Sequence, residues 1–448
     1  MSFENQEWRT FELDELCTVT DCQHKTAPVV NYKTNFRMLR TTNIRNGRIN
    51  SEDARYVTEE TYKAWSVRGK LVEDDVILTR EAPMGEVGII KSSNEKFFLG
   101  QRMLQLKAKT DVILPYFLYY SLLTPEVQNQ IKMHEGTGSV VSNIRIPALK
   151  KFKLMVPVLK IQESVSTMLR LIDDKIDLNN AINKNLEEMA QALFKRWFVD
   201  FEFPNENSEP YKSSGGEFEE SELGLIPKGW KVKTLGEVSI QGIVCGKTPS
   251  TKEKDNFGEE TPFITIPDMH NKVFVTKTER ALSSKGAGTQ ASKTVPAFSV
   301  CVSCIATPGL VVLTSEPSQT NQQINTIICN SNECYYVYLS LSRISEYIKN
   351  MGSGGSVALN LSKSRFSNIK MVLPEQSILD QFHNLVEPMF ATILLIQKET
   401  ESLSITRDTL LPKLMSGEIR VPLDEEYPYS QSSDLPLAAE SKAQYSTT

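Results

Sequence analysis

The sequence predicts an α+β fold in which two β-rich domains are separated by two long antiparallel, coiled-coil-like helices, all related by a pseudo-twofold internal repeat. Three observations support this prediction. Motifs in the first half of the chain recur in the second half in the same order. Short β-branched and aromatic runs, separated by Gly, Pro, Asn and Ser, fill the first part of each copy. A long heptad pattern then closes each copy.

The repeat is carried by short motifs whose offset drifts from 222 to 217 residues along the 448-residue chain. Trp8 and Trp230 open the two copies at an offset of 222. "GQRMLQL" at Gly100 corresponds to "NQQINTI" at Asn321, and "PYFLYYSL" corresponds to "CYYVYLSL". "GTGSVVSNIRIPALKKFKLMVP" matches "GSGGSVALNLSKSRFSNIKMVLP". A slow drift at constant order is expected for a tandem duplication that has since gained and lost loop residues.

The first part of each copy is predicted to be rich in short strands. The runs "DDVILTR", "EVGIIK", "PFITI" and "FSVCVSCIA" have the composition of buried strands and are bounded by turn residues, at 74–80, 86–91, 262–266 and 298–306. One aromatic helix interrupts each block, at 116–123 and 335–341. After the closing Val-Pro or Leu-Pro, the pattern changes to that of a long helix.

The two helical segments carry apolar residues with a 4,3,4,3 spacing, which is the seam of a coiled coil. Each segment is about 33 residues long, or roughly 50 Å. We expect the helices to pair with each other, antiparallel; the alternative is that each packs on its own β-rich block. Polar residues in the middle of both seams would fix the register. The expected apolar seam positions are Leu169, Ile172, Ile176, Leu186, Leu193, Trp197, Met389, Ile393, Ile396, Leu403, Leu410 and Leu414.

These patterns divide the chain into six segments. We expect β-rich domains over 1–157 and 227–374 and helical spacers over 158–204 and 375–421. A polar, acidic linker is expected at 205–226 and a disordered tail at 422–448.

Composition indicates a globular chain, with 40% hydrophobic and 23% charged residues. Without a membrane-spanning run or an apolar signal-peptide core, the chain is expected to be cytoplasmic. The net charge of −5 hides an alternation of +3, −7, +6 and −7 over 1–157, 158–226, 227–374 and 375–448. Both β-rich blocks are therefore mildly basic, as expected of parts that contact a polyanion.

The sequence offers little catalytic or metal-binding chemistry. "GIVCGKTP" resembles a phosphate-binding loop, but it has three residues between the glycines instead of four, and Pro249 blocks a following helix. Cys301, Cys304, Cys329 and Cys334 could supply four thiolates for zinc. Their setting in strand-like runs favours ordinary buried cysteines instead.

Binding chemistry remains, because residues that read base edges and phosphates gather near predicted strand ends in both blocks. Arg suits guanine, Asn and Gln suit adenine, and Lys and Thr suit phosphates. The alternative is that these are solvated loop residues. The DNA-binding candidates are Arg37, Arg40, Asn43, Arg45, Arg48, Arg80, Gln101, Arg102, Lys247, Thr248, Lys272, Asn321, Gln322 and Gln323.

The ordered motifs resemble one protein family over about residues 7–421. The "IPKGWKVKTLGEV" opening, "GKTPS", "DDVILTREAPMGEVGII" with "GQR", the Gly-Ser-Gly stretches and the "LLPKLMSGEI" ending are similar to the specificity subunits of type I restriction–modification enzymes. In the first copy, "HKTAP" at 24–28 matches "GKTPS" less well.

The resemblance implies a non-catalytic DNA-recognition subunit. Each β-rich block would be a target recognition domain that reads one half of an asymmetric, bipartite double-stranded DNA site. The helices would set the gap between the halves and dock two modification (methyltransferase) subunits, with restriction (endonuclease and translocase) subunits completing the complex. S-adenosylmethionine, ATP and Mg would bind the partner subunits, so this chain would hold no cofactor.

Two alternatives to this function follow from the sequence. The chain could be a scaffold or adaptor that binds proteins through its helical pair. It could also be a self-contained nuclease or methyltransferase whose site lacks a familiar motif.

Overall fold

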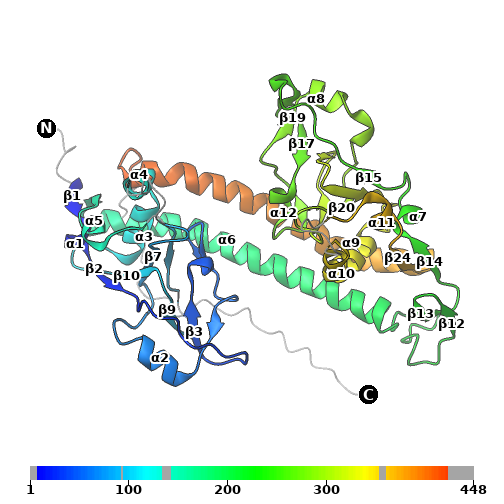
Figure 1. Ribbon diagram of the computed structural model, residues 1–448, viewed down its shortest axis with the longest axis horizontal. Helices are drawn as coiled ribbons and strands as arrows, with labels where there is room; N and C mark the ends of the chain where they lie inside the picture. The colour runs from blue at the N-terminus through cyan, green and yellow to red at the C-terminus, as the bar shows by residue number, and fades with distance from the viewer. Residues whose placement is uncertain (1–7, 92–93, 134–142, 353–359, 422–448) are drawn as a thin grey trace, which may run out of the picture. The chain divides into compact units, whose positions relative to one another are not determined.

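The computed structural model describes residues 8–91, 94–133, 143–352 and 360–421 (Figure 1). The chain divides into two compact units. Unit 1 comprises Met1–Asp173 together with Ile405–Thr448, and unit 2 comprises Asp174–Ser404. Each unit therefore contains one β-rich block and parts of both long helices. The tail predicted over 422–448 and part of each Gly-Ser-Gly stretch lie outside the described residues.

Unit 1 is built on a four-stranded sheet of order β2-β10-β7-β8 and a three-stranded sheet of order β6-β3-β9. Two further strand pairs, β1–β11 and β4–β5, lie outside these sheets. The strands are β1 Trp8–Glu12, β2 Cys17–Asp21, β3 Phe36–Leu39, β4 Ile44–Arg45, β5 Arg48–Ile49, β6 Arg55–Tyr56, β7 Val76–Thr79, β8 Val87–Ile89, β9 Lys96–Leu99, β10 Met103–Ala108 and β11 Lys153–Pro157.

Unit 2 contains a five-stranded sheet of order β15-β23-β20-β21-β18 and a four-stranded sheet of order β16-β19-β17-β22. The pair β14–β24 stands apart from them. The strands are β14 Lys231–Thr234, β15 Val244–Cys245, β16 Phe257–Gly258, β17 Thr261–Ile264, β18 Phe274–Val275, β19 Ala281–Leu282, β20 Val300–Ser303, β21 Val311–Thr314, β22 Gln319–Thr320, β23 Ile324–Ile327 and β24 Lys370–Leu373.

Strand pairing confirms the predicted repeat. The order β2-β10-β7-β8 in unit 1 corresponds to β15-β23-β20-β21 in unit 2. Strand β3 pairs antiparallel with β6 and parallel with β9, as β17 pairs with β19 and β22. The antiparallel pair β1–β11 corresponds to β14–β24. The four runs predicted as strands overlap β7, β8, β17 and β20.

The predicted aromatic helices are α3 and α9, and both are central to a core. In α3, Phe117 and Leu118 are fully buried, and α9 buries Tyr335, Tyr336 and Tyr338. Helices that are apolar on nearly every face are found inside a domain and not on its surface. The shorter helices are α1 Leu13–Leu16, α2 Glu59–Trp65, α3 Pro115–Leu123, α4 Pro125–Lys132, α5 Ile146–Leu149, α7 Leu235–Val238, α8 Ser284–Gly288, α9 Cys334–Arg343, α10 Ser345–Gly352 and α11 Lys363–Ser367.

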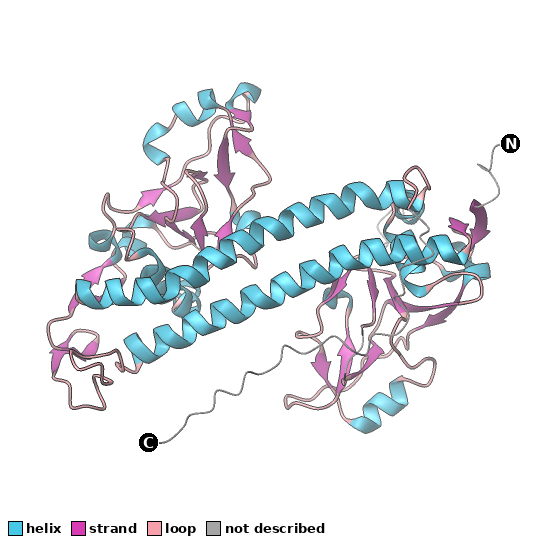
Figure 2. Ribbon diagram, turned by 180° about the vertical axis from the view of Figure 1, so that it is seen from behind, coloured by secondary structure: helices cyan, strands magenta, loops and turns pink. Residues whose placement is uncertain are grey.

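The two long helices are α6 Leu159–Phe194 and α12 Gln376–Met415, and they lie side by side and antiparallel within each unit (Figure 2). In unit 1 the start of α6, with Leu169, shares a core with the end of α12, with Leu414. In unit 2 the end of α6, with Phe194, shares a core with the first part of α12, with Phe382 and Ile393. None of the twelve predicted apolar seam residues is exposed. The expected antiparallel pairing is confirmed.

Polar residues within the seam make specific bonds. In unit 2, Asn179 donates from Nδ2 to Oε2 of Glu399 at 2.8 Å and to the hydroxyl of Thr400 at 3.2 Å. In unit 1, Asp173 accepts from Nη1 of Arg407 at 2.8 Å and from the hydroxyl of Tyr120 at 2.9 Å. These bonds form in only one register of the helices, which is the role expected of polar seam residues.

The two opening tryptophans have equivalent surroundings. In unit 2, the Trp230 ring packs 5.0 Å from Phe203 and 6.0 Å from Phe198, just after α6. In unit 1, Trp8 lies beside Gly417, just after α12, where an added Cβ would come within 2.8 Å of the indole nitrogen. Gly417 has a φ of +77°, which also favours glycine. Each tryptophan thus closes its block onto the helix that comes from the other copy.

The segment expected to be an acidic linker, 205–226, is ordered against unit 2. Strand β12 Phe218–Ser221 pairs antiparallel with β13 Gly224–Pro227. The ring of Tyr211 stacks on Phe203 with centroids 4.5 Å apart. Acidic composition predicted a solvated linker, but the burial of these aromatic rings around Trp230 outweighs it.

Within the described ranges, no helix combines the length and hydropathy needed to span a membrane.

Candidate nucleic-acid interface

In unit 2, two of the predicted DNA-binding segments meet at one end of the β15–β23 strand pair. The loop after β15 carries Lys247 and Thr248, and the loop between β22 and β23 carries Gln322. The Thr248 hydroxyl donates to Oε1 of Gln322 at 2.7 Å. The backbone amide of Lys247 donates to the carbonyl of Thr320 at 3.0 Å. The two loops therefore form one surface.

Gly246 makes this contact sterically feasible. A Cβ at position 246 would lie 2.2 Å from the carbonyl oxygens of Thr320 and Asn321. Beneath the loop, Gln290 donates from Nε2 to the carbonyl of Lys247 at 2.6 Å and to Oε1 of Gln319 at 2.8 Å. The "GKT" motif is thus a close-packed turn, consistent with its rejection as a nucleotide-binding loop.

The tip residues of this surface differ in exposure. Lys247 and Gln322 are exposed, and Thr248 and Gln323 are half-buried. Asn321 is only 8% exposed, and its side chain shapes the turn. Its Oδ1 accepts from the amide of Gln323 at 3.0 Å, and its Nδ2 donates to Oε1 of Gln323 at 2.9 Å. Asn321 therefore positions the neighbouring glutamines and does not face a ligand itself.

Unit 1 contains the same loop pair. Asp21 pairs with Leu104 across β2–β10, as Cys245 pairs with Asn325 across β15–β23. The loop after β2 therefore corresponds to the loop after β15. Within it, "HKT" at 24–26 aligns with "GKT" at 246–248 if unit 1 has two additional residues, Cys22 and Gln23, between the strand and the motif. Gln101 donates from Nε2 to the carbonyl of His24 at 3.2 Å, which joins this loop to Gly100–Arg102.

Lys25 is a residue that the sequence reasoning missed. It is exposed in the loop after β2, in the position of Lys247. Its signal was the offset of 222 between the two lysines, the same offset that relates Trp8 to Trp230.

Arg80 holds the base of the unit 1 loop pair. Its Nη1 donates to both carboxylate oxygens of Asp21, at 3.0 and 3.1 Å, and its Nε donates to the carbonyl of Ile144 at 3.2 Å. Its side chain is 12% exposed. Arg80 is therefore a structural residue, and its side chain is not free to make the predicted DNA contact.

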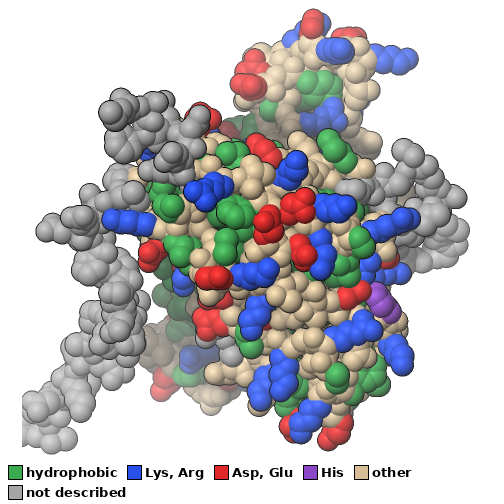
Figure 3. All heavy atoms as spheres, turned by 90° about the vertical axis from the view of Figure 1, so that its left-hand side faces the viewer, with side chains coloured by type: hydrophobic (Ala, Val, Ile, Leu, Met, Phe, Trp, Pro, Cys, Tyr) green, Lys and Arg blue, Asp and Glu red, His purple; other side chains and the backbone are tan. Residues whose placement is uncertain are grey.

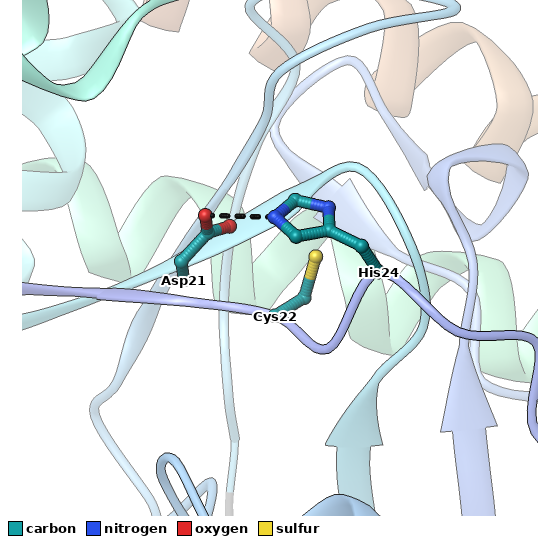
Figure 4. Close-up of side chains that lie close together, drawn as sticks. All are labelled: Asp21, Cys22 and His24. Atoms are coloured by element: carbon teal, nitrogen blue, oxygen red, sulfur yellow. Dashed lines mark hydrogen bonds and ion pairs between the residues drawn. The ribbon is translucent and has the colours of Figure 1, made fainter.

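Asp21, Cys22 and His24 form a compact cluster at the same place (Figure 4). Their ligand-type atoms lie within 4.8 Å of one another, and Nε2 of His24 is 3.1 Å from Oδ2 of Asp21. Arg80 already neutralises the carboxylate, and burial raises the pKa of the Cys22 thiol, which disfavours the thiolate. The cluster thus has the chemistry of a loop anchor more than of a metal site.

The arginine-rich segment of unit 1 divides into buried and exposed residues. Arg37 is 4% exposed; its Nη1 donates to Oε1 of Glu95 at 2.7 Å, and its Nε donates to the carbonyl of Ala54 at 3.2 Å. Asn43 is 2% exposed, and its Oδ1 accepts from the amide of Arg40 at 2.8 Å. Both were predicted to contact DNA, but Arg37 is bonded within the fold and Asn43 is buried with its Oδ1 occupied, so neither side chain faces a ligand. The segment has the polar composition of an exposed loop, so the sequence did not indicate that these two residues are buried.

Arg45 and Arg48 flank the tight turn of the β4–β5 hairpin. Asn46 and Gly47 have φ values of +51° and +79°, as a two-residue hairpin turn requires. Arg45 is exposed, whereas Nη2 of Arg48 donates to Oδ1 of Asp173 at 3.2 Å. Arg45 stays a candidate contact. Arg48 is reassigned to fastening the hairpin to α6.

The other candidates divide in the same way. Arg102 is 51% exposed with Nε 3.3 Å from Glu81, and Arg40 is half-buried with Nη2 bonded to the carbonyl of Asp53. Lys272 lies 3.5 Å from Oε1 of Glu401 on α12, within unit 2, so it is better explained as a structural residue. The candidates that remain are Arg40, Arg45, Gln101, Arg102, Lys247, Thr248, Gln322 and Gln323, with Lys25 added.

The four cysteines considered for zinc are not gathered into a site. Within the described residues, which include all four, the one group of three ligand-type side chains within 4.8 Å is the Asp21 cluster. Burial raises the pKa of Cys301 and Cys304 to about 12, so both are thiols at neutral pH. Asn325 donates to Sγ of Cys304 at 3.2 Å. They are ordinary core cysteines.

On the face that Figure 3 presents, Lys and Arg side chains are interspersed with Asp and Glu side chains. On this face, mixed charges produce no extended field of one sign that would attract a polyanion.

The comparisons with known proteins agree with the repeat. The family model described as type I restriction modification DNA specificity domain matches twice, over residues 5–188 and 227–403. The chain belongs to this family. It is a type I restriction–modification specificity subunit. The scaffold alternative is therefore not favoured.

Individual members of the family span most of the chain. The HindI specificity subunit of Haemophilus influenzae is 34% identical over 388 residues, covering 75% of this chain and 84% of that protein. The MjaIX specificity subunit of Methanocaldococcus jannaschii is 28% identical over 377 residues, covering 83% of each. The crystal structure of a type I S subunit from M. genitalium shares the fold with a TM-score of 0.52, at 17% identity, covering 92% of this chain and 98% of that one.

Proposed function

We propose that each unit of this specificity subunit reads one half of an asymmetric, bipartite double-stranded DNA target. The observation that carries the proposal is the recurrence of one loop pair with different residues at its tips. Gln101 and Arg102 in unit 1 stand where unit 2 has Gln322 and Gln323. Equivalent positions with different donor and acceptor groups select different bases, so the two half-sites would differ.

The side chains suggest that some loop residues contact bases and others contact phosphates. The amides of Gln101 and Gln322 would read adenine edges, and the guanidinium of Arg102 would read guanine. Lys25 and Lys247, at equivalent positions, would hold phosphates and give an affinity that falls with salt. In this proposal the loop contacts Gln101–His24 and Thr248–Gln322 pre-position the glutamines before DNA arrives.

The chemistry would belong to partner subunits. We propose that two modification subunits dock on the helices and direct adenine methylation, and that restriction subunits add cleavage. S-adenosylmethionine, ATP and Mg would bind those partners, and this chain alone would neither methylate nor cut DNA. Assays of the purified chain, with and without its modification subunit, test this division.

Methylation mapping is the direct test. Genomic DNA from cells expressing this chain with its modification subunit should carry one interrupted motif. We expect Gln101→Ala to relax one half of that motif and Gln322→Ala to relax the other, each leaving the opposite half unchanged. A contiguous motif, or a substitution that alters both halves, would refute the two-unit reading. Gln241→Ala, exposed in the loop between α7 and β15, is the matched control and should leave the motif intact.

A further inference from the structure

In each unit, a side chain at the end of a short helix holds the backbone of the loop-tip lysine. In unit 1, Nε1 of Trp65, the last residue of α2, donates to the carbonyl of Lys25 at 3.2 Å. In unit 2, Nε2 of Gln290, just after α8, donates to the carbonyl of Lys247 at 2.6 Å. The same backbone atom of equivalent lysines is therefore held in both units, although one donor is an indole and the other is an amide.

Trp65 and Gln290 occupy equivalent places in the repeat. Helices α2 and α8 follow the corresponding strands β6 and β19. Each helix begins after an N-cap residue, Thr58 or Ser283, whose hydroxyl accepts from the amide three residues later. Trp65 and Gln290 both stand seven residues after that N-cap. The position and the hydrogen bond thus recur in the two copies, whereas the residue type does not.

The residue behind each of these side chains matches it in chemistry. In unit 2, Gln290 also donates to Oε1 of Gln319 at 2.8 Å, and Gln319 is fully buried on β22. By the offset of 221 residues that relates "GQR" to "NQQ", the residue of unit 1 at this place is Phe98 on β9. Phe98 is fully buried, and Trp65 packs against the apolar cluster that contains it. The two positions therefore differ together between the units, as an amide pair in one and an aromatic pair in the other.

The peptide groups on both sides of each lysine are held. In unit 1, the carbonyl of His24, which precedes Lys25, accepts from Nε2 of Gln101 at 3.2 Å. In unit 2, the amide of Lys247 donates to the carbonyl of Thr320 at 3.0 Å. Both lysine side chains are exposed. A fixed backbone limits where an exposed ammonium group can reach, and it reduces the conformational entropy lost on binding.

We propose that Trp65 and Gln290 are positioning residues, which fix the backbone of Lys25 and Lys247 so that these lysines contact DNA phosphates. The inference rests on the proposed function, in which the two lysines hold phosphates. Trp65 and Gln290 would act through the lysines and not by touching DNA; Gln290 is only 6% exposed, and its Nε2 is occupied by two bonds. Loss of either holding bond would leave the lysine present but its backbone less restrained, so DNA affinity would fall.

Equilibrium binding of duplex DNA that carries the target, by the chain in complex with its modification subunit, tests this inference. Trp65→Phe keeps an aromatic ring but removes the indole N–H, and Gln290→Met keeps a side chain of similar length but removes the amide. Each should weaken binding about fivefold, because a typical hydrogen bond that fixes the bound geometry contributes about that factor. Gln241→Met removes an amide from an exposed position of unit 2 and should bind like the wild type.

Double variants distinguish a positioning role from general structural support. If Trp65 acts through Lys25, Trp65→Phe/Lys25→Gln should bind within about twofold of Lys25→Gln alone, because the lysine has no contact left to lose. Gln290→Met/Lys247→Gln should behave in the same way. The pairs that cross the units, Trp65→Phe/Lys247→Gln and Gln290→Met/Lys25→Gln, should instead show the product of the two single losses. Purely structural support would give that product in every pair.

Two outcomes would overturn this inference and leave the proposed function intact: losses that multiply within one unit, or wild-type binding by Trp65→Phe and Gln290→Met while the lysine variants bind weakly. Wild-type binding by Lys25→Gln and Lys247→Gln would instead contradict the phosphate contacts of the proposed function, and this inference with them. The two units give independent tests, so a variant that fails to fold in one unit leaves the cycle in the other unit decisive.

Discussion

Arg37 and Arg45 are eight residues apart in one arginine-rich segment, yet their surroundings are opposite. The Arg37 side chain is 5% exposed and bonded to Glu95 and to backbone carbonyls. Arg45 is exposed at the hairpin turn, and its Nη1 contacts the carbonyls of Thr41 and Ile44. At the scale of residues, burial therefore determines which of the two arginines can contact DNA.

We expect Arg37→Ala to lower the free energy of unfolding by about 3 kcal/mol, because it leaves buried acceptors without a donor. Arg45→Ala should change stability by less than about 0.5 kcal/mol. It should instead weaken DNA binding and lower the magnitude of the salt slope by about 1. Urea unfolding and a salt series of gel shifts measure the two effects. A stability loss of similar size in both variants would contradict the assignment.

Asp173 is the residue at which several elements of unit 1 converge. It accepts from Arg407 on α12, from Tyr120 on α3 and from Arg48 on β5. Burial alone would lower the pKa of the Arg407 guanidinium, but its bonds to Asp173 and Asp408 raise that pKa above the ordinary value. Burial and the Asp173 carboxylate also raise the pKa of the Tyr120 hydroxyl, so it remains a donor.

Asp173→Ala should cost about 3–5 kcal/mol of stability in unit 1, since it strands a largely buried guanidinium and a buried phenol. Asp408 also pairs with Arg407, at 2.8 Å, but is 65% exposed. Asp408→Ala is the matched control and should cost about 0–1 kcal/mol. Denaturant unfolding, followed by hydrogen exchange in α3, distinguishes the two. Equal losses would show that the surface charge matters as much as the buried one.

At the scale of elements, α6 carries a titrating group at its contact with α9. The Glu187 carboxylate accepts from the Tyr338 hydroxyl at 3.3 Å and from Gln191 at 3.2 Å. Burial raises the pKa of Glu187 above its usual value. The folded state therefore binds this proton more tightly than the unfolded state. That contribution to stability is present at acid pH and is lost as the pH rises through the folded pKa.

Glu187→Gln should therefore unfold at higher denaturant than wild type near neutral pH, because the amide keeps hydrogen-bonding groups without the buried charge. The difference should vanish near about pH 4, where the unfolded carboxyl also becomes protonated. Glu163→Gln, on the exposed side of α6, should leave the midpoint unchanged at both pH values. A variant that is less stable than wild type at neutral pH would contradict this reading.

At the scale of the whole molecule, α6 and α12 are continuous helices that each pass from one unit into the other. Removing seven residues from both should shorten the connection by about 10.5 Å while keeping the seam in register. We expect the gap between the two half-sites to shorten by about three base pairs, with both half-sites unchanged.

Methylation mapping with the shortened chain measures the gap between the two half-sites. Removing five residues from both helices is the control, because it rotates the following residues by about 140° and breaks the seam. That control should lose DNA modification instead of shifting the gap. An unchanged gap after the seven-residue deletion would refute the role of the helices as a spacer.

Much of the architecture follows from sequence periodicity. The 4,3,4,3 spacing from Leu169 to Trp197 predicted the buried face of α6, because a seam of that length is stable only against another helix. The repeat predicted that the strand pairing would occur twice. The fate of residues 205–226 was not predictable from composition, since acidic residues outnumber the few aromatic rings that fold this segment onto Trp230.

The sequence by itself determined the duplication, the paired helices and the two loops that carry Gln101 and Gln322, because these depend on local pattern and on correspondence between the copies. Only the tertiary structure decided which polar residues are free to bind. Arg37, Arg80 and Asn321 have the chemistry of DNA contacts, but partners distant in the chain or the turn itself occupy their hydrogen-bonding groups, and Asn43 is buried. The residue type alone sets which hydrogen bonds a side chain can make, whereas the fold decides which partners occupy those groups.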